Sequence, residues 1–184
     1  MTNLLSILED YRARSAAAID SIPLDSVAAL INDLVAVREA GGRVFCIGNG
    51  GSQANVQHLV LHLREHGIFA IDLLADNAAV TALANDEGYE NVAGMMIQRF
   101  CWHQGDMILA VTGKGHSDNV NKVLFFTAEN MRMPIKWAIV GFDGGETKRH
   151  AKLVHIPVSE YGPFEDSCTA VLHMVSEGLR SLSA

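Results

Sequence analysis

The sequence predicts a three-layer, doubly wound α/β domain, in which helices cover both faces of a five-stranded parallel sheet. Short apolar runs alternate with helical segments along most of the chain. In addition, two glycine-rich turns each follow an apolar run and precede a helix. Alternation of this kind is typical of parallel sheets that are buried on both faces. With 184 residues, the chain is expected to form a single domain over residues 1–184.

Two helices are expected before the first strand. Apolar residues recur at helical spacing over residues 3–20, and Pro23 ends this segment. A second helix is expected over 25–40, and Gly41-Gly42 marks its end. Because neither helix belongs to the alternation, we expect the segment 1–42 to pack on the domain or on a neighbouring subunit.

The other elements follow from apolar periodicity and from the position of turn residues. Strands are expected at 43–47, 68–73, 107–111, 135–140 and 153–156. Helices are expected from the first glycine-rich turn to about residue 66, within 77–100, over 117–131 and from about 165 to 182.

The composition is that of an ordinary globular protein and excludes several function classes. Hydrophobic residues make up 49% and charged residues 19% of the chain, and the formal net charge is -7. An acidic chain without a basic patch is not expected to bind nucleic acid. An anionic substrate would therefore have to be bound by local features, such as backbone amides and a helix N-terminus.

The sequence also predicts a cytoplasmic protein. Cys46, Cys101 and Cys168 are widely spaced and odd in number, so we expect buried, reduced thiols rather than a disulfide framework. The N-terminal segment carries charged residues at positions 9, 10 and 12 and does not have the pattern of a signal peptide. No apolar run approaches about 18 residues, so no membrane-spanning segment is expected.

The first glycine-rich turn covers Gly48 to Ser52. Its glycines allow positive φ values and a close approach of an oxyanion to the backbone. Asn49, Gly50 and Gly51 are therefore expected to bind substrate. Ser52 is expected to cap the next helix and to donate its hydroxyl to a phosphate. The alternative is a tight strand-to-helix turn in which Ser52 only caps the helix.

The second glycine-rich turn also follows a strand and precedes a helix. Its side-chain donors include Lys114, which lies between two glycines, and His116. Thr112, Gly113, Lys114 and Ser117 are expected to bind substrate. Because the carboxyl ends of parallel strands border one crevice, we expect the two turns to form a single anion site.

A dinucleotide site is a weaker alternative. The first turn nearly fits the Rossmann pattern, with Asp72 downstream, but Gln53 stands in place of the third glycine. The Walker pattern fails in the second turn, because Gly115 is followed by His116-Ser117 rather than by Lys-Ser.

Four side chains form a candidate metal site. His58 and His62 are four residues apart on one face of a helix, and Glu165 and His173 are eight residues apart, nearly on one face of the last helix. Three imidazoles and a carboxylate suit a tetrahedral zinc or a similar divalent ion. The alternative is a set of structural histidines, since His62 lies among leucines.

A polar segment at 84–90 follows an apolar helix. Its Asp86 is a candidate for contacts with the hydroxyl groups of a sugar. The alternative is that Asn85 or Asp86 caps the start of a helix.

These motifs resemble those of the sugar isomerase (SIS) domain family, in the branch of the phosphoheptose isomerases, which act on sedoheptulose 7-phosphate. The matching segments occur in the family's order and cover nearly the whole chain, at 47–52, 57–58, 85–90, 112–120 and 173. The resemblance implies a homotetramer with sites between subunits and two loops that grip a sugar phosphate. It implies that Ser52, Thr112 and Ser117 lie near the phosphate and that Asp86 lies near the sugar hydroxyls.

The resemblance also implies a metal group, from which this chain departs at two positions. In the family the group is a histidine, a glutamate four residues later, a glutamine near the C-terminus and a histidine eight residues after that. His58 and His173 match this pattern. His62 stands in place of the glutamate, and Glu165 stands in place of the glutamine. The carboxylate has moved to another helix, so the formal charge of the group is unchanged.

Two further departures lie around the second turn. Lys114 and His116 replace a serine and an asparagine of a more hydroxyl-rich loop. The segment 161–164 replaces an approach to the last helix that carries threonine and arginine.

The expected function is aldose–ketose isomerisation of a phosphorylated sugar through an enediol, assisted by a divalent metal, with zinc expected. Glu165 or His62 is the expected base and His173 the partner acid. Because a metal-bound histidine has its lone pair engaged, Glu165 is the better proton carrier if all four residues bind metal. The alternative is a non-catalytic phosphosugar sensor or protein-interaction module on the same fold, which would fit the missing glutamate.

Overall fold

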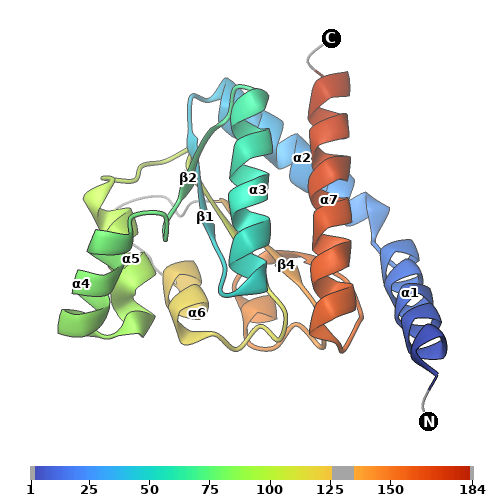
Figure 1. Ribbon diagram of the computed structural model, residues 1–184. Coiled ribbons are helices and arrows are strands. Elements are labelled where there is room, and N and C mark those ends of the chain that lie inside the picture. Colours follow the sequence, from blue (N-terminus) through green and yellow to red (C-terminus); the bar gives the residue numbers. More distant parts are fainter. Residues whose placement is uncertain (1–2, 126–134, 183–184) are drawn as a thin grey trace.

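The computed structural model describes residues 3–125 and 135–182, and it confirms the predicted fold class. Its five strands form one parallel sheet in the order β2-β1-β3-β4-β5 (Figure 1). Each strand lies within two residues of its predicted bounds. The strands are β1 Arg43–Ile47, β2 Phe69–Asp72, β3 Met107–Thr112, β4 Ile135–Val140 and β5 Lys152–His155.

Seven α-helices are described, together with a short 3₁₀ helix, η1 (Thr147–Arg149). The predicted helical segment 77–100 is divided in two at Gly88, whose φ of 87° interrupts the helix. Residues 126–131 of the predicted helix 117–131 lie outside the described residues. The helices are α1 Leu4–Asp20, α2 Leu24–Glu39, α3 Gly51–Glu65, α4 Asn77–Glu87, α5 Tyr89–Arg99, α6 Asp118–Phe125 and α7 Tyr161–Ser181.

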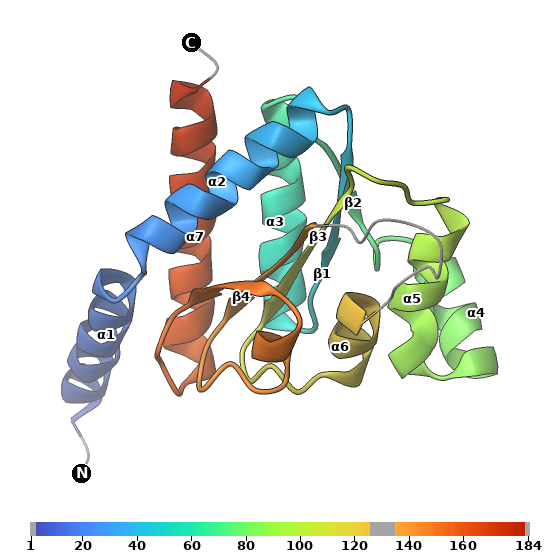
Figure 2. The same cartoon turned by 180° about the vertical axis from the view of Figure 1, so that it is seen from behind.

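The helices form two layers on opposite faces of the sheet (Figures 1 and 2). Alternate residues of β1 show how the core is divided. Val44 and Cys46 belong to the hydrophobic cluster that contains buried residues of α2, α3 and α7. Phe45 and Ile47 belong to the cluster that contains buried residues of α4, α5 and α6. Because strand side chains alternate between faces, a strand that is apolar throughout is buried on both.

The strand order places the two glycine-rich turns side by side. Within the sheet, β2 lies next to β1 on one side, and β3 lies next to β1 on the other side. The order of strands therefore reverses at β1. In a doubly wound sheet, ligands bind in the crevice beside the carboxyl ends of the strands at such a reversal of order. The turns after β1 and β3 both border this crevice.

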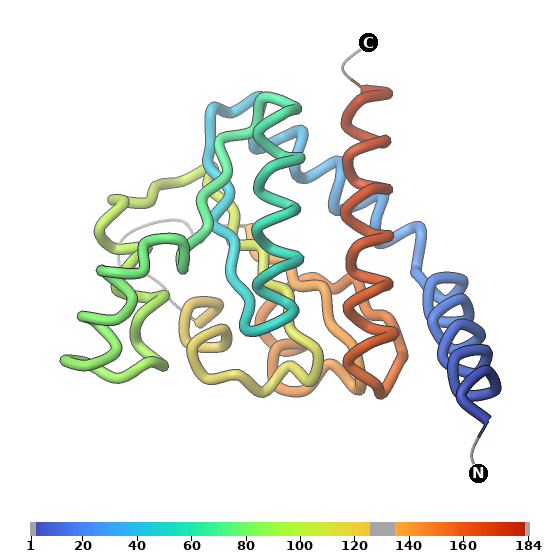
Figure 3. Tube along the Cα trace, viewed as in Figure 1, coloured from blue at the N-terminus to red at the C-terminus, as the bar shows by residue number. Residues whose placement is uncertain are grey.

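The first helix, α1, packs against the N-terminal half of α7 and extends beyond the body of the domain (Figure 3). The hydroxyls of Tyr11 and Ser15 each donate a hydrogen bond of 2.8 Å to Asp166 Oδ2. Much of the apolar surface of α1 is nevertheless exposed. The exposed large hydrophobic side chains of α1 are those of Leu4, Leu5, Ile7, Leu8, Tyr11 and Ile19.

The cysteines are only partly as expected. All three are free thiols, and burial raises the pKa of Cys46 and of Cys168. Cys101, however, is exposed, so the prediction that it is buried is wrong. It lies in the turn after α5 with a φ of 47°. In the described part of the chain, no helix has the length and apolar character needed to span a membrane.

Candidate functional site

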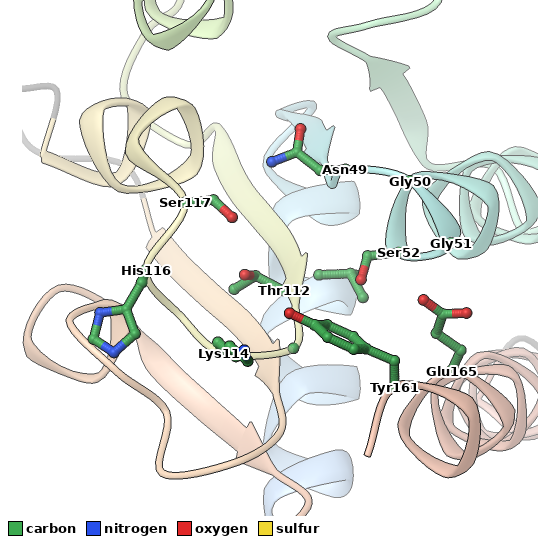
Figure 4. Close-up of a pocket in the computed structure, with 12 residues that line it drawn as sticks. Asn49, Gly50, Gly51, Ser52, Thr112, Lys114, His116, Ser117, Tyr161 and Glu165 are labelled. Atoms are coloured by element: carbon green, nitrogen blue, oxygen red, sulfur yellow. The ribbon is translucent and has the colours of Figure 1, made fainter. Parts of the chain in front are cut away.

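A cavity of about 450 Å³ opens at the crevice beside β1 and β3 (Figure 4). Both glycine-rich turns contribute to its wall, as does the start of α7. Every residue of the two turns that the sequence predicts to bind substrate lines this cavity. The lining residues are Asn49, Gly50, Gly51, Ser52, Val111, Thr112, Gly113, Lys114, His116, Ser117, Tyr161 and Glu165.

The first turn presents the N-terminus of α3 to the cavity. Gly50 has a φ of 56° and stands at the N-cap position without a side-chain capping bond, and α3 begins at Gly51. The prediction that Ser52 is the N-cap is therefore wrong, because Ser52 lies inside the first turn of the helix. The first N–H groups of a helix have no intrahelical acceptor and carry the positive end of its dipole. This end of α3 therefore favours an anion in the cavity.

Asn49 is held in place by two neighbours. Its side-chain amide exchanges two hydrogen bonds of 2.9 Å with the side-chain amide of Asn119. The Tyr89 hydroxyl donates a further bond of 2.8 Å to Asn49 Oδ1. Sequence reasoning did not find Tyr89 or Asn119 as partners of the turn, because they come from the helices α5 and α6.

The second turn is fixed by the chain after β4. The Gly115 carbonyl accepts backbone hydrogen bonds from Glu146 at 2.9 Å and from Thr147 at 3.1 Å, and it also accepts one from the Thr147 hydroxyl at 3.1 Å. Gly115 has a φ of 68°, and a Cβ on this residue would collide with the carbonyl of Gly144. The backbone of this turn is therefore set by direct contact with a neighbouring loop.

Glu165 enters the cavity from α7. Its carboxylate lies against the Cα of Gly51, in the space that a side chain at position 51 would occupy (Figure 4). The Asn55 amide donates a 3.2 Å hydrogen bond to the carbonyl of Glu165, which fixes the backbone of α7 against α3 at this level. A carboxylate is thus placed at the wall of an anion site, where it can exchange a proton with a bound molecule.

The three predicted histidine ligands come together on α3 and α7, and none of them lines the described cavity. One potential ligand atom from each of His58, His62 and His173 lies within 4.8 Å of the others. The Nε2 atoms of His58 and His62 are 2.9 Å apart. Burial, followed by the neighbouring rings of His62 and His173, lowers the pKa of His58 below its usual value. A neutral imidazole is the form that binds a metal ion.

Glu165 does not belong to this histidine group among the described residues, which corrects the predicted four-ligand set. The physical reason is the distance between the two residues along α7. The eight residues between Glu165 and His173 correspond to a rise of about 12 Å and a rotation of about 80°. A different carboxylate, that of Glu65, contacts the group, with its Oε2 at 3.1 Å from His62 Nδ1.

Two further differences concern substrate contacts. Asp86 does not line the cavity; it is exposed on α4 and accepts a 2.8 Å hydrogen bond from Asn85. Both residues lie inside α4, so neither caps a helix. Tyr161, in contrast, lines the cavity although it was not among the predicted site residues. Its only signal in the sequence was its position in the segment that departs from the resembled family.

Asp72 does not take the part that a dinucleotide site requires. Its Oδ1 accepts hydrogen bonds from Gln53 Nε2 at 2.7 Å and from the Leu74 N–H at 2.9 Å. Asp72 does not line the described cavity. The carboxylate therefore braces the first turn instead of presenting itself to a ribose.

Comparison with known proteins supports a specific class. The chain is 32% identical over 165 residues to the phosphoheptose isomerase of Mycobacterium tuberculosis (strain ATCC 25177 / H37Ra), which covers 86% of this chain and 83% of the relative. It is 33% identical over 136 residues to the DnaA initiator-associating protein DiaA of Klebsiella pneumoniae, which covers 71% of this chain and 67% of that relative. No model of a known protein family matches the chain.

A solved structure shows the same fold. The phosphoheptose isomerase from Neisseria gonorrhoeae superposes with a TM-score of 0.87 at 22% sequence identity, over 97% of this chain and 100% of that chain. The fold and the two-turn cavity define a sugar isomerase (SIS) domain. Within that class, the chain belongs to the phosphoheptose isomerase family and is an isomerase. The resemblance found in the sequence is confirmed.

Proposed function

We propose that the protein interconverts an aldose phosphate and a ketose phosphate, with sedoheptulose 7-phosphate as the ketose. One observation carries this proposal. The anion-binding cavity, an acid–base carboxylate and a group of three histidines all lie along the adjacent helices α3 and α7. The names of the isomerase relatives support the same class of substrate.

The phosphate is assigned to the two glycine-rich turns. Ser52 and Thr112 are 6% and 5% exposed, and both line the cavity, so their hydroxyls are available in a largely desolvated setting. Ser117 lines the same cavity and precedes α6. Together with the N-terminus of α3, these groups donate hydrogen bonds without adding full charges. They bind the non-reacting end of the substrate.

The reacting end of the sugar is assigned to the space between the turns and the histidines. Glu165 lines the cavity from α7, and His173 lies about 12 Å further along the same helix. A linear seven-carbon sugar that is phosphorylated at one end can extend in this direction. Glu165 is then the base that removes the proton beside the carbonyl, which gives an enediol. The same proton, or one from water, returns to the neighbouring carbon.

The histidine group fits a divalent metal, for which zinc is the proposed ion. The structure offers three nitrogen donors with mutual distances suited to one ion, and the lowered pKa of His58 favours its neutral form. His58, His62 and His173 would hold the ion, and a fourth position would remain open. When bound, zinc supplies a Lewis acid that polarises a carbonyl oxygen. His173 is exposed, whereas His58 and His62 are partly buried.

The assembly is proposed to be a homotetramer in the cytoplasm. The apolar side chains exposed on α1, together with Leu61 beside the histidines on α3, would be covered by neighbouring copies. Light scattering coupled to size exclusion gives the mass directly. A monomer at micromolar concentration would contradict the tetramer without affecting the assignment of the phosphate site.

A second candidate function is a non-catalytic phosphosugar sensor or protein-interaction module. Two observations favour it: a relative is named for its association with an initiator protein, and His62 stands where the resembled family has a glutamate. Incubation with sedoheptulose 7-phosphate, followed by NMR detection of products, separates the two candidates. Formation of an aldose 7-phosphate supports the isomerase, whereas tight binding without turnover supports the sensor. Absence of both would overturn each of them.

A further inference from the structure

We propose that Lys114 supplies the fixed positive charge that binds the phosphate of the substrate, and that Phe142 and Tyr161 are positioning residues that hold its ammonium at the cavity. The proposal deepens the proposed function, because it names how the phosphate site obtains its charge. It concerns binding of the anion and not the transfer of the proton.

The ammonium of Lys114 lies beside a pair of aromatic rings that contact each other. Its Nζ is 5.5 Å from the centroid of the Phe142 ring and 5.6 Å from that of the Tyr161 ring. The two ring centroids are 5.3 Å apart. Both distances from the ammonium fall within the range of about 6 Å over which a ring attracts a cation. The two rings therefore restrict a side chain that would otherwise be flexible.

Aromatic partners leave the charge of the lysine available. A carboxylate partner would neutralise the ammonium, whereas a ring attracts it and adds no net charge. Within the described residues, no ion pair involves Lys114. By contrast, Lys148 on the neighbouring loop contacts Asp143, with Nζ and Oδ2 3.7 Å apart. The ammonium of Lys114 therefore keeps its N–H donors and its positive charge available to a ligand in the cavity that it lines.

Phe142 is fixed in an unusual conformation. Its φ is 48°, in the left-handed region that residues with a Cβ rarely adopt. The Phe142 N–H donates a 2.8 Å hydrogen bond to the Val158 carbonyl, and the Phe142 carbonyl lies 2.8 Å from His155 Nε2. Such conformations persist only where the surroundings hold them, and they occur often at ligand sites. In this conformation the centroid of the Phe142 ring lies 5.5 Å from Lys114 Nζ.

The loop that carries Phe142 also contacts the backbone of Lys114. A Cβ on Gly145 would collide with the Lys114 carbonyl, so the two loops meet backbone to backbone at this point. Gly145 itself has a φ of 50°. This close contact keeps the ring of Phe142 in register with the lysine.

Tyr161 completes the arrangement from α7. It is the first residue of that helix, and its ring packs so closely on Gly113 that a Cβ there would lie 2.9 Å from Tyr161 Cε1. The ring therefore covers the turn between β3 and α6 and forms part of the cavity wall (Figure 4).

The charges around the cavity show why this lysine matters. The ionisable side chains of its described wall, Tyr161 apart, are Lys114, His116 and Glu165. Lys114 alone among these carries a full positive charge at neutral pH. The chain has a formal net charge of -7, so a phosphate dianion approaches against the overall field. A local fixed cation offsets this repulsion together with the N-terminus of α3.

Calorimetric titration with inorganic phosphate tests the charge. We expect Lys114→Ala to weaken phosphate binding about tenfold, the loss expected for one charge-assisted hydrogen bond. Added salt should weaken binding to the wild type more than binding to the variant. The control is Lys148→Ala, which removes the same charge from a neighbouring loop outside the cavity wall and should change binding less than twofold. Equal binding by the Lys114→Ala variant and the wild type would overturn the proposal.

The positioning residues are tested by a pair of variants at one site. Tyr161→Phe keeps the ring and should bind phosphate as the wild type does. Tyr161→Ala removes the ring and should weaken binding about threefold, in line with one exposed cation–π contact. With sedoheptulose 7-phosphate, the loss should appear in KM and not in kcat. Equal losses in the two variants would assign the effect to the hydroxyl and contradict the positioning role. Because inorganic phosphate needs no turnover, these results stand apart from failure of the isomerase assignment.

Discussion

The carboxylate of Glu165 lies against the Cα of Gly51, where the helix α3 begins beside the cavity. This contact places the only acidic side chain of the described cavity wall beside the start of α3. It also makes the glycine necessary, because any side chain at position 51 would displace the carboxylate.

Gly51→Ala is therefore expected to reduce kcat at least tenfold by moving the carboxylate of Glu165. The collision involves the far end of a flexible side chain, so the free energy of unfolding should change by less than about 1 kcal/mol. Steady-state kinetics and urea unfolding check both expectations. Gly94→Ala is a matched control, since a Cβ on Gly94 meets nothing within 4 Å. If the double variant with Glu165→Gln lost activity additively, the two residues would not act as one unit.

Zinc affinity should depend on the histidine group and on the carboxylate that contacts it. His62→Ala is expected to abolish tight binding, because it removes one of three nitrogen donors. Glu65→Gln is expected to weaken binding about 10-fold to 100-fold, since it removes the partner of His62 Nδ1. Competition with a chromogenic chelator measures both. His66→Ala should leave the affinity unchanged, because His66 pairs with the Ser176 hydroxyl. If the His62→Ala variant bound zinc with the affinity of the wild type, the proposed metal site would be contradicted.

Stability should depend on a buried ion pair between Arg43 and Asp106, at the amino ends of the inner strands β1 and β3. Asp106 is 1% exposed, and its carboxylate accepts hydrogen bonds from Arg43 Nη2 at 2.7 Å and from the His103 N–H at 2.8 Å. Burial acts to raise the pKa of Asp106, but hydrogen bonds from the Arg43 guanidinium and from the N–H groups of His103 and Arg43 hold it below its usual value. Asp106→Asn is expected to lower the free energy of unfolding by about 3 kcal/mol at pH 7.

The sign of the pH dependence follows from the lowered pKa. The contribution of Asp106 is complete above the unfolded pKa, which is about 3.9, and is lost as the pH falls through the lower folded value. The difference between the wild type and Asp106→Asn should therefore narrow below about pH 4. Urea unfolding at several pH values measures it, with the exposed Asp86→Asn as a control. A difference that stays constant down to pH 2 would contradict the role of the carboxylate.

The order of strands and helices could be predicted because each element buries a periodic apolar face. The start of α7 could not, since the last helix was predicted to begin only at about residue 165. The helix begins at Tyr161, so Pro163 lies in its first turn, where a missing N–H costs no intrahelical hydrogen bond.

The site was predictable where it depends on local sequence. The two glycine-rich turns converge because parallel strands end at one edge of the sheet. The contact of Glu165 with Gly51 depends instead on how α7 packs along α3, which no local pattern encodes. The place of Tyr161 depends likewise on a contact with Gly113 on a distant turn.

The most direct test of the central claim is an NMR time course with sedoheptulose 7-phosphate in D2O, for the wild type and for Glu165→Gln. The account predicts that the wild type forms an aldose 7-phosphate, which carries deuterium at the reacting carbon to the extent that the abstracted proton exchanges with solvent. It also predicts that Glu165→Gln binds the sugar phosphate with similar affinity but turns it over at least about a hundredfold more slowly, the usual contribution of general acid–base catalysis. Full turnover by Glu165→Gln, or tight binding without turnover by the wild type, would contradict it.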